Sequence, residues 1–195
     1  MPKIVDYELK KQEIIEKAKE VFAKRGYYNT NIADISEKCG MGRTTIYQYF
    51  KNKDEIFYYT IGDFLEELKV KVEAIVNDQS LTFLEKLKKL VFELTSEYEH
   101  DNIFVLLVEM WIILKRENNK LLEMLKSYTQ ELKIQIKNLI SQGIAANEIK
   151  PIDSESMADT IYSFIESFTL QSVSNNIDKQ RKLSSLNILI DGLRV

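Results

Sequence analysis

The chain has 195 residues, 45% of them apolar, and its 27 Lys and Arg against 30 Asp and Glu give a net charge of −3 at pH 7. This apolar content excludes a disordered chain, and 6 Gly with 2 Pro exclude a fibrous one. One His and one Cys, His100 and Cys39, exclude a His/Cys metal cluster and an internal disulfide. We therefore expect a globular protein that holds no metal and no other cofactor.

The sequence carries no recognisable secretion signal or membrane span. Its first six residues lack a long apolar core, and the most apolar run, 103–114, includes Glu109. A membrane-spanning helix needs about 20 apolar residues, so this run indicates a buried helix instead. We expect a soluble, cytoplasmic protein.

Apolar residues recur three and four positions apart along nearly the whole chain, which predicts an all-α fold. The first helix ends at Gly26. Asn31, with Asp34 three positions later, has the spacing of a capping box for a short second helix that stops at Gly40. About nine helices are predicted, at 7–25, 32–39, 43–50, 53–76, 83–100, 103–115, 120–146, 153–168 and 178–193.

Charge is distributed unevenly along the chain. Residues 1–53 contain 11 Lys and Arg against 7 Asp and Glu, a net charge of +4, so the remaining residues carry −7. A basic segment on an acidic body indicates that one end of the protein meets a polyanion. Chance variation over so short a segment explains the same numbers equally well.

Two short helices joined by the three-residue turn 40–42 predict a helix-turn-helix motif, in which the second helix enters the major groove of DNA. Ile46 and Phe50 lie four positions apart and would anchor that helix inward. Arg, Gln and Thr read base edges, and the lysines after the helix suit phosphates. The candidate DNA-binding residues are Asn31, Arg43, Thr44, Thr45, Tyr47, Gln48, Tyr49, Lys51 and Lys53.

The segments 22–36 and 40–55 together resemble the TetR/AcrR-type bacterial transcription regulators. The resemblance covers about residues 10–60 and joins an F-A-x-x-G-Y helix end, the turn, and a Y-x-Y-F-K-x-K segment. It implies an all-α homodimer whose first three helices bind operator DNA. It also implies that the remainder encloses a small-molecule pocket and ends in two helices that form a four-helix dimer interface. The corresponding domains would be residues 1–53 and 54–195.

The resemblance also assigns roles to individual residues. It places Asn31 and Lys53 on phosphate contacts, Arg43 and Thr45 on base-reading positions, and Tyr47 and Tyr49 on positions that touch backbone or bases. The chain departs from the family pattern at two positions. Gly42 stands where a Ser-like cap is usual, and Asn31 replaces the usual Thr, so base preference could differ.

The C-terminal part contains many large apolar side chains, some of which would line an effector pocket. Such stripes are more often ordinary core, and for Glu109, beside Met110 and Trp111, an exposed helix edge is favoured over a pocket position. The pocket candidates are Phe64, Tyr98, Phe104, Leu107, Glu109, Met110, Trp111, Met124, Tyr128 and Phe168. The dimer-interface candidates are Ile161, Phe164, Ile165, Leu186, Leu189, Ile190 and Leu193.

We therefore expect a dimeric, ligand-responsive DNA-binding repressor that a small apolar or amphipathic effector releases from a palindromic operator. An enzyme is not expected, because the sequence offers no nucleophile–base pair, metal set or phosphate loop. The alternative is a helical protein–protein adaptor of the same fold that has lost DNA binding. Arg43, Lys51 and Lys53 argue against that alternative.

Overall fold

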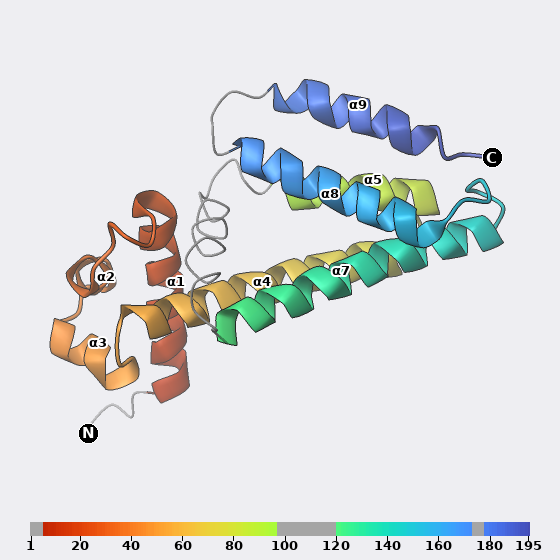
Figure 1. The fold of residues 1–195 in the computed structure, drawn as a ribbon. Coiled ribbons are helices and arrows are strands. Elements are labelled where there is room, and N and C mark those ends of the chain that lie inside the picture. The colour runs from red at the N-terminus through yellow and green to blue at the C-terminus, as the bar shows by residue number, and fades with distance from the viewer. Residues whose placement is uncertain (1–5, 97–119, 173–177) are drawn as a thin grey trace. The chain divides into compact units, whose positions relative to one another are not determined.

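The computed structural model of the protein describes residues 6–96, 120–172 and 178–195, which form helices joined by short turns (Figure 1). This confirms the predicted all-α fold, and no strand occurs in the described ranges. The predicted helix at 103–115 lies outside them. Among the described helices, none has the length and apolar content to cross a bilayer. The helices are α1 (Tyr7–Arg25), α2 (Ile32–Cys39), α3 (Arg43–Tyr49), α4 (Lys53–Asn77), α5 (Phe83–Ser96), α7 (Lys120–Ala145), α8 (Ser154–Ser172) and α9 (Lys179–Asp191).

Local side-chain signals account for the ends of the N-terminal helices. The Asp6 carboxylate accepts hydrogen bonds from the backbone N–H groups of Glu8 and Leu9, which fixes the start of α1. Gly26 ends α1 with φ of 75°, a left-handed angle that favours glycine. The Asn52 side chain accepts from the backbone N–H of Glu55 at 2.8 Å, which fixes the start of α4.

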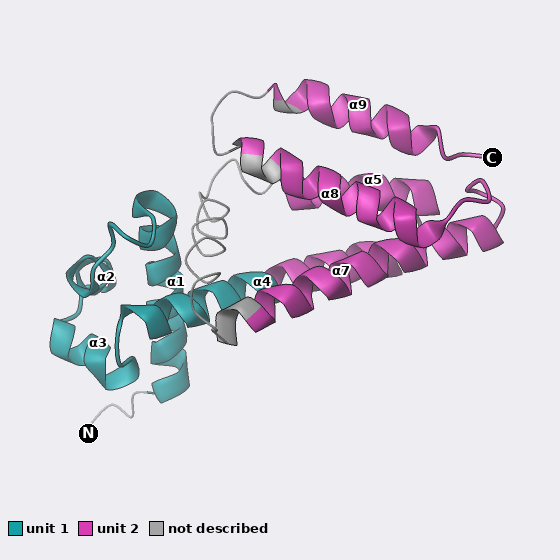
Figure 2. Cartoon of the chain, viewed as in Figure 1, with its two compact units in different colours: residues 1–66, 99–122 teal, residues 67–98, 123–195 magenta. Residues whose placement is uncertain are grey.

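The described helices belong to two compact units (Figure 2). Unit 1 contains α1, α2, α3, α4 up to Glu66 and residues 120–122 of α7, so the units divide within α4 and α7. The boundary at 53/54 remains a prediction. The core of unit 1 is made by apolar side chains that recur on the inner faces of α1, α2, α3 and α4. The fully or almost fully buried ones are Ile14, Ala18, Phe22, Ile35, Ile46, Phe50, Ile56 and Ile61.

Unit 2 contains α4 from Glu67, α5, α7 from Glu123, α8 and α9. Helix α5 packs against both α8 and α9. Ion pairs join α7 to α8: Lys137 lies 2.8 Å from Glu155, and Lys133 lies 2.9 Å from Asp159. The core of unit 2 is built by Leu87, Leu90, Val91, Leu94, Leu132, Ile136, Leu139, Ile140, Ile161, Ile165, Phe168, Leu186 and Ile190.

Residues 148–150 and 193–195 pair in antiparallel fashion to form what we term the C-terminal clasp. The backbone N–H of Lys150 donates to the Leu193 carbonyl at 2.8 Å, and that of Val195 donates to the Glu148 carbonyl at 3.2 Å. The Glu148 carboxylate also accepts from the backbone N–H of Phe83 at the start of α5. The clasp therefore ties the end of α9 to the turn after α7 and, through Glu148, to α5.

Lys86 on α5 is almost fully buried, with 5% of its surface exposed, and caps the end of α4. Its ammonium donates to the Val76 carbonyl at 2.8 Å. Because a charged buried donor satisfies this carbonyl, we expect Lys86→Met to lower the free energy of unfolding by about 1–3 kcal/mol. Urea unfolding followed by circular dichroism measures this loss.

Lys89→Met is the matched control for this substitution. Lys89 is exposed and its ammonium lies 3.8 Å from Asp78, an arrangement worth less than about 1 kcal/mol. Equal unfolding midpoints for the Lys86→Met variant and the wild type would contradict the capping role of Lys86.

Candidate functional site

Helix α3 presents a polar face to solvent because its apolar side chains point into unit 1. Ile46 is 0% exposed, and Phe50, which follows the helix, is 2% exposed. The N-terminus of α3 has no side-chain cap, as the sequence predicted from Gly42. The remaining side chains are exposed at Arg43, Thr44, Tyr47 and Gln48 and half-buried at Thr45 and Tyr49.

The predicted capping box of α2 is confirmed. The Asn31 side-chain oxygen accepts from the Asp34 backbone N–H at 3.1 Å, and the Asp34 carboxylate accepts from the Asn31 backbone N–H at 2.8 Å. Arg25 forms an ion pair with the same Asp34 carboxylate. Since the cap uses only the oxygen of the exposed Asn31 amide, its NH₂ group is left to donate to a phosphate.

The start of α1 packs against the end of α3. The Tyr7 ring stacks on the Tyr49 ring with centroids 4.8 Å apart, and its hydroxyl lies 3.4 Å from the Gln48 carbonyl. The Lys11 ammonium lies 3.8 Å from the centre of the Tyr59 ring. Sequence reasoning missed these supporting residues, because no local pattern shows that the start of α1 meets the end of α3.

The three basic side chains around α3 differ in what they already contact. Arg43 and Lys51 are exposed, and neither side chain has an ion pair or hydrogen bond with any residue that the structure describes. Lys53 is half-buried, and its ammonium donates to the Tyr27 carbonyl at 2.8 Å and lies 4.1 Å from the Tyr27 ring centre. Arg43 and Lys51 are therefore available to an anion, whereas Lys53 supports the fold.

Six of the ten pocket candidates lie outside the described residues: Tyr98, Phe104, Leu107, Glu109, Met110 and Trp111. Of the other four, Phe64 is buried in unit 1 and Phe168 is buried in unit 2. Met124 and Tyr128 are half-buried on α7. The structure thus brings Met124, Tyr128 and Phe168 into one unit and assigns Phe64 to the other.

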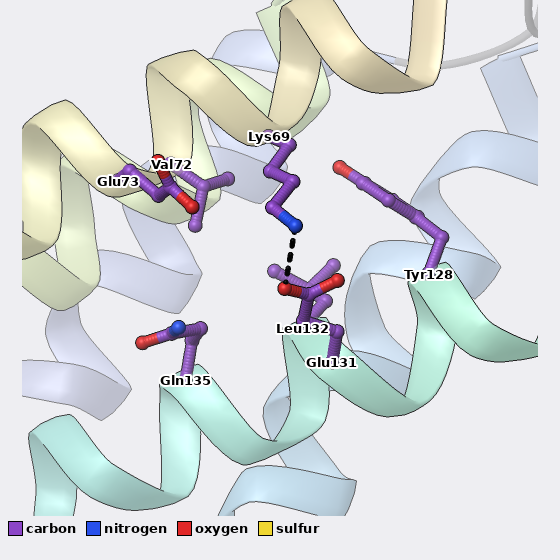
Figure 3. Close-up of a pocket in the computed structure, with 7 residues that line it drawn as sticks. All are labelled: Lys69, Val72, Glu73, Tyr128, Glu131, Leu132 and Gln135. Atoms are coloured by element: carbon purple, nitrogen blue, oxygen red, sulfur yellow. Dashed lines mark ion pairs between the residues drawn. The ribbon is translucent and has the colours of Figure 1, made fainter. Parts of the chain in front are cut away.

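A cavity of about 10 Å³, room for roughly one water molecule, lies between α4 and α7 in unit 2 (Figure 3). Tyr128 reaches from α7 toward α4, and the Lys69 ammonium forms a 3.0 Å ion pair with Glu131 across the gap. The lining residues are Lys69, Val72, Glu73, Tyr128, Glu131, Leu132 and Gln135.

Two tyrosines in unit 2 place hydroxyl groups in the protein interior. The Tyr162 hydroxyl on α8 lies 3.2 Å from the Thr129 hydroxyl on α7. The Tyr128 hydroxyl is buried and has no hydrogen-bond partner among the described residues. Burial raises the pKa of Tyr128 far above its ordinary value and the pKa of Tyr162 to about 12. These shifts move both phenols further from ionisation than an exposed tyrosine.

The dimer-interface candidates separate into buried and accessible side chains. Ile161, Ile165, Leu186 and Ile190 are buried within the subunit, so their apolar surface already packs in the core of unit 2. Phe164 and Leu193 are half-buried, and Leu189 is 66% exposed. Ile188, which the sequence did not single out, is 68% exposed beside Leu189 on α9. Periodicity shows that a helix has an apolar face but not which chain covers it.

Residues 14–59 match the family model described as "Bacterial regulatory proteins, tetR family". The chain is 29% identical over 150 residues to the fatty acid metabolism regulator protein of Bacillus subtilis, covering 72% of this chain and 71% of that protein. It is 25% identical over 169 residues to the transcriptional repressor KstR2 of Mycolicibacterium smegmatis, covering 84% and 78%. Both relatives are named as regulators and not as enzymes.

A solved structure shows the same fold over nearly the whole chain. The transcriptional regulator FadR of Bacillus subtilis, in complex with stearoyl-CoA, matches with a TM-score of 0.66 and 24% identity, covering 92% of this chain and 96% of that chain. At this identity, the match shows that the two chains share a fold.

Lys53→Met should lower the thermal midpoint of unfolding, because it removes a charged donor from the Tyr27 carbonyl and a cation from the Tyr27 ring. A loss of about 1–2 kcal/mol corresponds to a decrease of roughly 2–8 °C for a chain of this size. Calorimetry measures the shift. Lys51→Met, which removes an exposed lysine without such contacts, should change the midpoint by less than about 1 °C. Equal midpoints for both variants would show that Lys53 is not structural.

Proposed function

We propose that this chain, which is a TetR-type transcriptional regulator, works as a homodimeric repressor that a lipid-like effector releases from a palindromic operator. The exposed polar face of α3 is the observation that carries the DNA-binding part. Its Arg43 guanidinium and the nearby Lys51 ammonium have no competing partner among the described residues. Free cations beside a helix with exposed Thr, Tyr and Gln suit the major groove.

The residues around α3 divide into two roles in this proposal. Arg43, Thr44, Thr45 and Gln48 would read base edges, because they lie on the N-terminal and outward parts of a helix that enters the groove. Phosphate contacts would come from Lys51 and the Asn31 amide, with Tyr47 and Tyr49 touching backbone or bases. The Lys53 ammonium would contribute less to DNA, since it already donates to the Tyr27 carbonyl.

We infer the effector class from the relatives. The Bacillus subtilis relative is named for fatty acid metabolism, and the FadR structure holds stearoyl-CoA. A long-chain acyl-CoA is therefore the first probe for this chain. Residues of α4 contribute to both compact units, so an effector that shifts α4 in unit 2 would change the DNA-binding unit as well.

Operator binding is tested with DNA from upstream of the protein's own gene and with random DNA of equal length, across a salt series. The wild type should prefer the upstream DNA, and its affinity should fall steeply with salt because phosphate contacts release counterions. Weak and equal binding to the upstream DNA, to random DNA and to all other fragments of the genome would contradict the repressor. It would favour the protein–protein adaptor.

Arg43→Ala and Lys51→Ala separate base reading from phosphate binding in the same assay. Arg43→Ala should weaken operator binding by about 10–100-fold and random-DNA binding by much less, since a base contact is worth about 1–3 kcal/mol. Lys51→Ala should weaken both DNAs alike and reduce the salt slope by about one. If Arg43→Ala causes equal losses on both DNAs, Arg43 does not read bases.

The dimer interface is tested on the exposed apolar side chains of α9. We expect Leu189→Glu to weaken dimerisation by about 100-fold or more, because a carboxylate without a partner would be buried between subunits. Ile134→Glu is the control, since Ile134 is an exposed apolar residue of α7, 46% exposed and outside α8 and α9. Sedimentation equilibrium measures both dissociation constants. A Leu189→Glu chain that dimerises like the wild type would exclude this face.

A further inference from the structure

The hydroxyl of Tyr128 is the one buried tyrosine hydroxyl in the described residues without a hydrogen-bond partner. Burying a hydroxyl without a partner costs about 1–3 kcal/mol, so native proteins retain such groups sparingly and often for a purpose. The hydroxyl lies at the far end of a ring that reaches from α7 toward α4 and lines the cavity between them (Figure 3). A partner other than the described residues would complete this group.

The surroundings of Tyr128 indicate which kind of partner fits. Lys69, which lines the same cavity, is paired with Glu131 at 3.0 Å. Lys133, whose ammonium lies 4.9 Å from the Tyr162 ring centre, is paired with Asp159 at 2.9 Å. Both cations near the two tyrosines are thus neutralised by carboxylates. Glu73 also lines the cavity, so its lining carries one cation and two carboxylates. A carboxylate or phosphate would be repelled by this net negative charge, whereas an uncharged oxygen would not be.

The protonation state of Tyr128 completes the chemical requirement. A tyrosine phenol is protonated at physiological pH, and burial raises the pKa of Tyr128 further, so the group offers an O–H donor. The neighbouring Tyr162 hydroxyl is already engaged with Thr129 and does not need a second partner. The group that suits this hydroxyl is therefore an uncharged hydrogen-bond acceptor.

We propose that the Tyr128 hydroxyl donates a hydrogen bond to an uncharged carbonyl oxygen of the effector, such as the thioester carbonyl of a long-chain acyl-CoA. This inference rests on the effector response proposed above and names the protein group that would recognise the effector. Since the cavity has room for about one water molecule, the effector would have to separate α4 from α7 locally to place its carbonyl beside the hydroxyl. Recognition at Tyr128 would then be coupled to a displacement of α4.

The first experiment compares Tyr128→Phe with Tyr162→Phe in the absence of ligand. Each variant removes one tyrosine hydroxyl from unit 2 and keeps the ring. Tyr162→Phe leaves Thr129 without its partner and should lower the thermal midpoint by roughly 2–4 °C. Tyr128→Phe removes an unpartnered hydroxyl and should leave the midpoint unchanged or raise it. A Tyr128→Phe midpoint as low as that of Tyr162→Phe would reveal a partner within the chain and overturn the proposal.

The second experiment removes the carbonyl oxygen from the ligand and the Tyr128 hydroxyl from the protein, separately and together. Stearoyl-CoA and its thioether analogue, which lacks the carbonyl oxygen, are titrated into the wild type and into Tyr128→Phe by calorimetry. We expect the wild type to prefer the thioester by about fivefold, the value of one neutral hydrogen bond, and Tyr128→Phe to bind both ligands alike. Tyr162→Phe should keep the wild-type preference.

The outcomes separate this inference from the proposed function. Equal discrimination by the wild type and Tyr128→Phe would overturn the role of Tyr128 even if stearoyl-CoA releases operator DNA. Failure of the wild type to bind stearoyl-CoA would overturn the ligand class of the inference. Operator recognition would stand in both cases, because it is measured without any ligand.

Discussion

The surface that we propose for DNA binding depends on the burial of Ile46 and Phe50. A helix of seven residues is too short to be stable alone in water, and α3 has no side-chain cap to help it. Its conformation therefore comes from two apolar side chains that lock one face into unit 1. The opposite face is exposed as a consequence, which makes the position of Arg43 and Gln48 a product of core packing rather than of helix propensity.

The sequence predicted the N-terminal helices well because residues close in sequence determine where each helix begins and ends. Asn31 with Asp34 and Asn52 with Glu55 are capping pairs three positions apart, and they fix the starts of α2 and α4. Gly26 supplies a backbone angle that other residues rarely adopt. Such signals are local, so they survive in a sequence read without any tertiary information.

What the sequence could not supply is the partner of each side chain. Lys53 reads as a phosphate-binding lysine, yet its ammonium donates to a carbonyl 26 positions away. Ile161 and Ile190 read as apolar enough for a subunit interface, yet the subunit buries them itself. The Tyr7–Tyr49 stack and the burial of the Tyr128 hydroxyl away from any hydrogen-bonding group of the described residues likewise arise from elements brought together by the fold. Composition and periodicity describe a residue's character but not its neighbours.

The C-terminal clasp has a consequence for how far such a chain can diverge. Backbone groups make its two hydrogen bonds, while the side chains of Lys150, Arg194 and Val195 are exposed. Almost any substitution at these three positions leaves the bonds intact, so selection can preserve the attachment of α9 without preserving a recognisable sequence. Proline is the exception, since at position 150 or 195 it would remove a donor. The attachment of α9 can therefore be retained after sequence similarity at these positions has been lost.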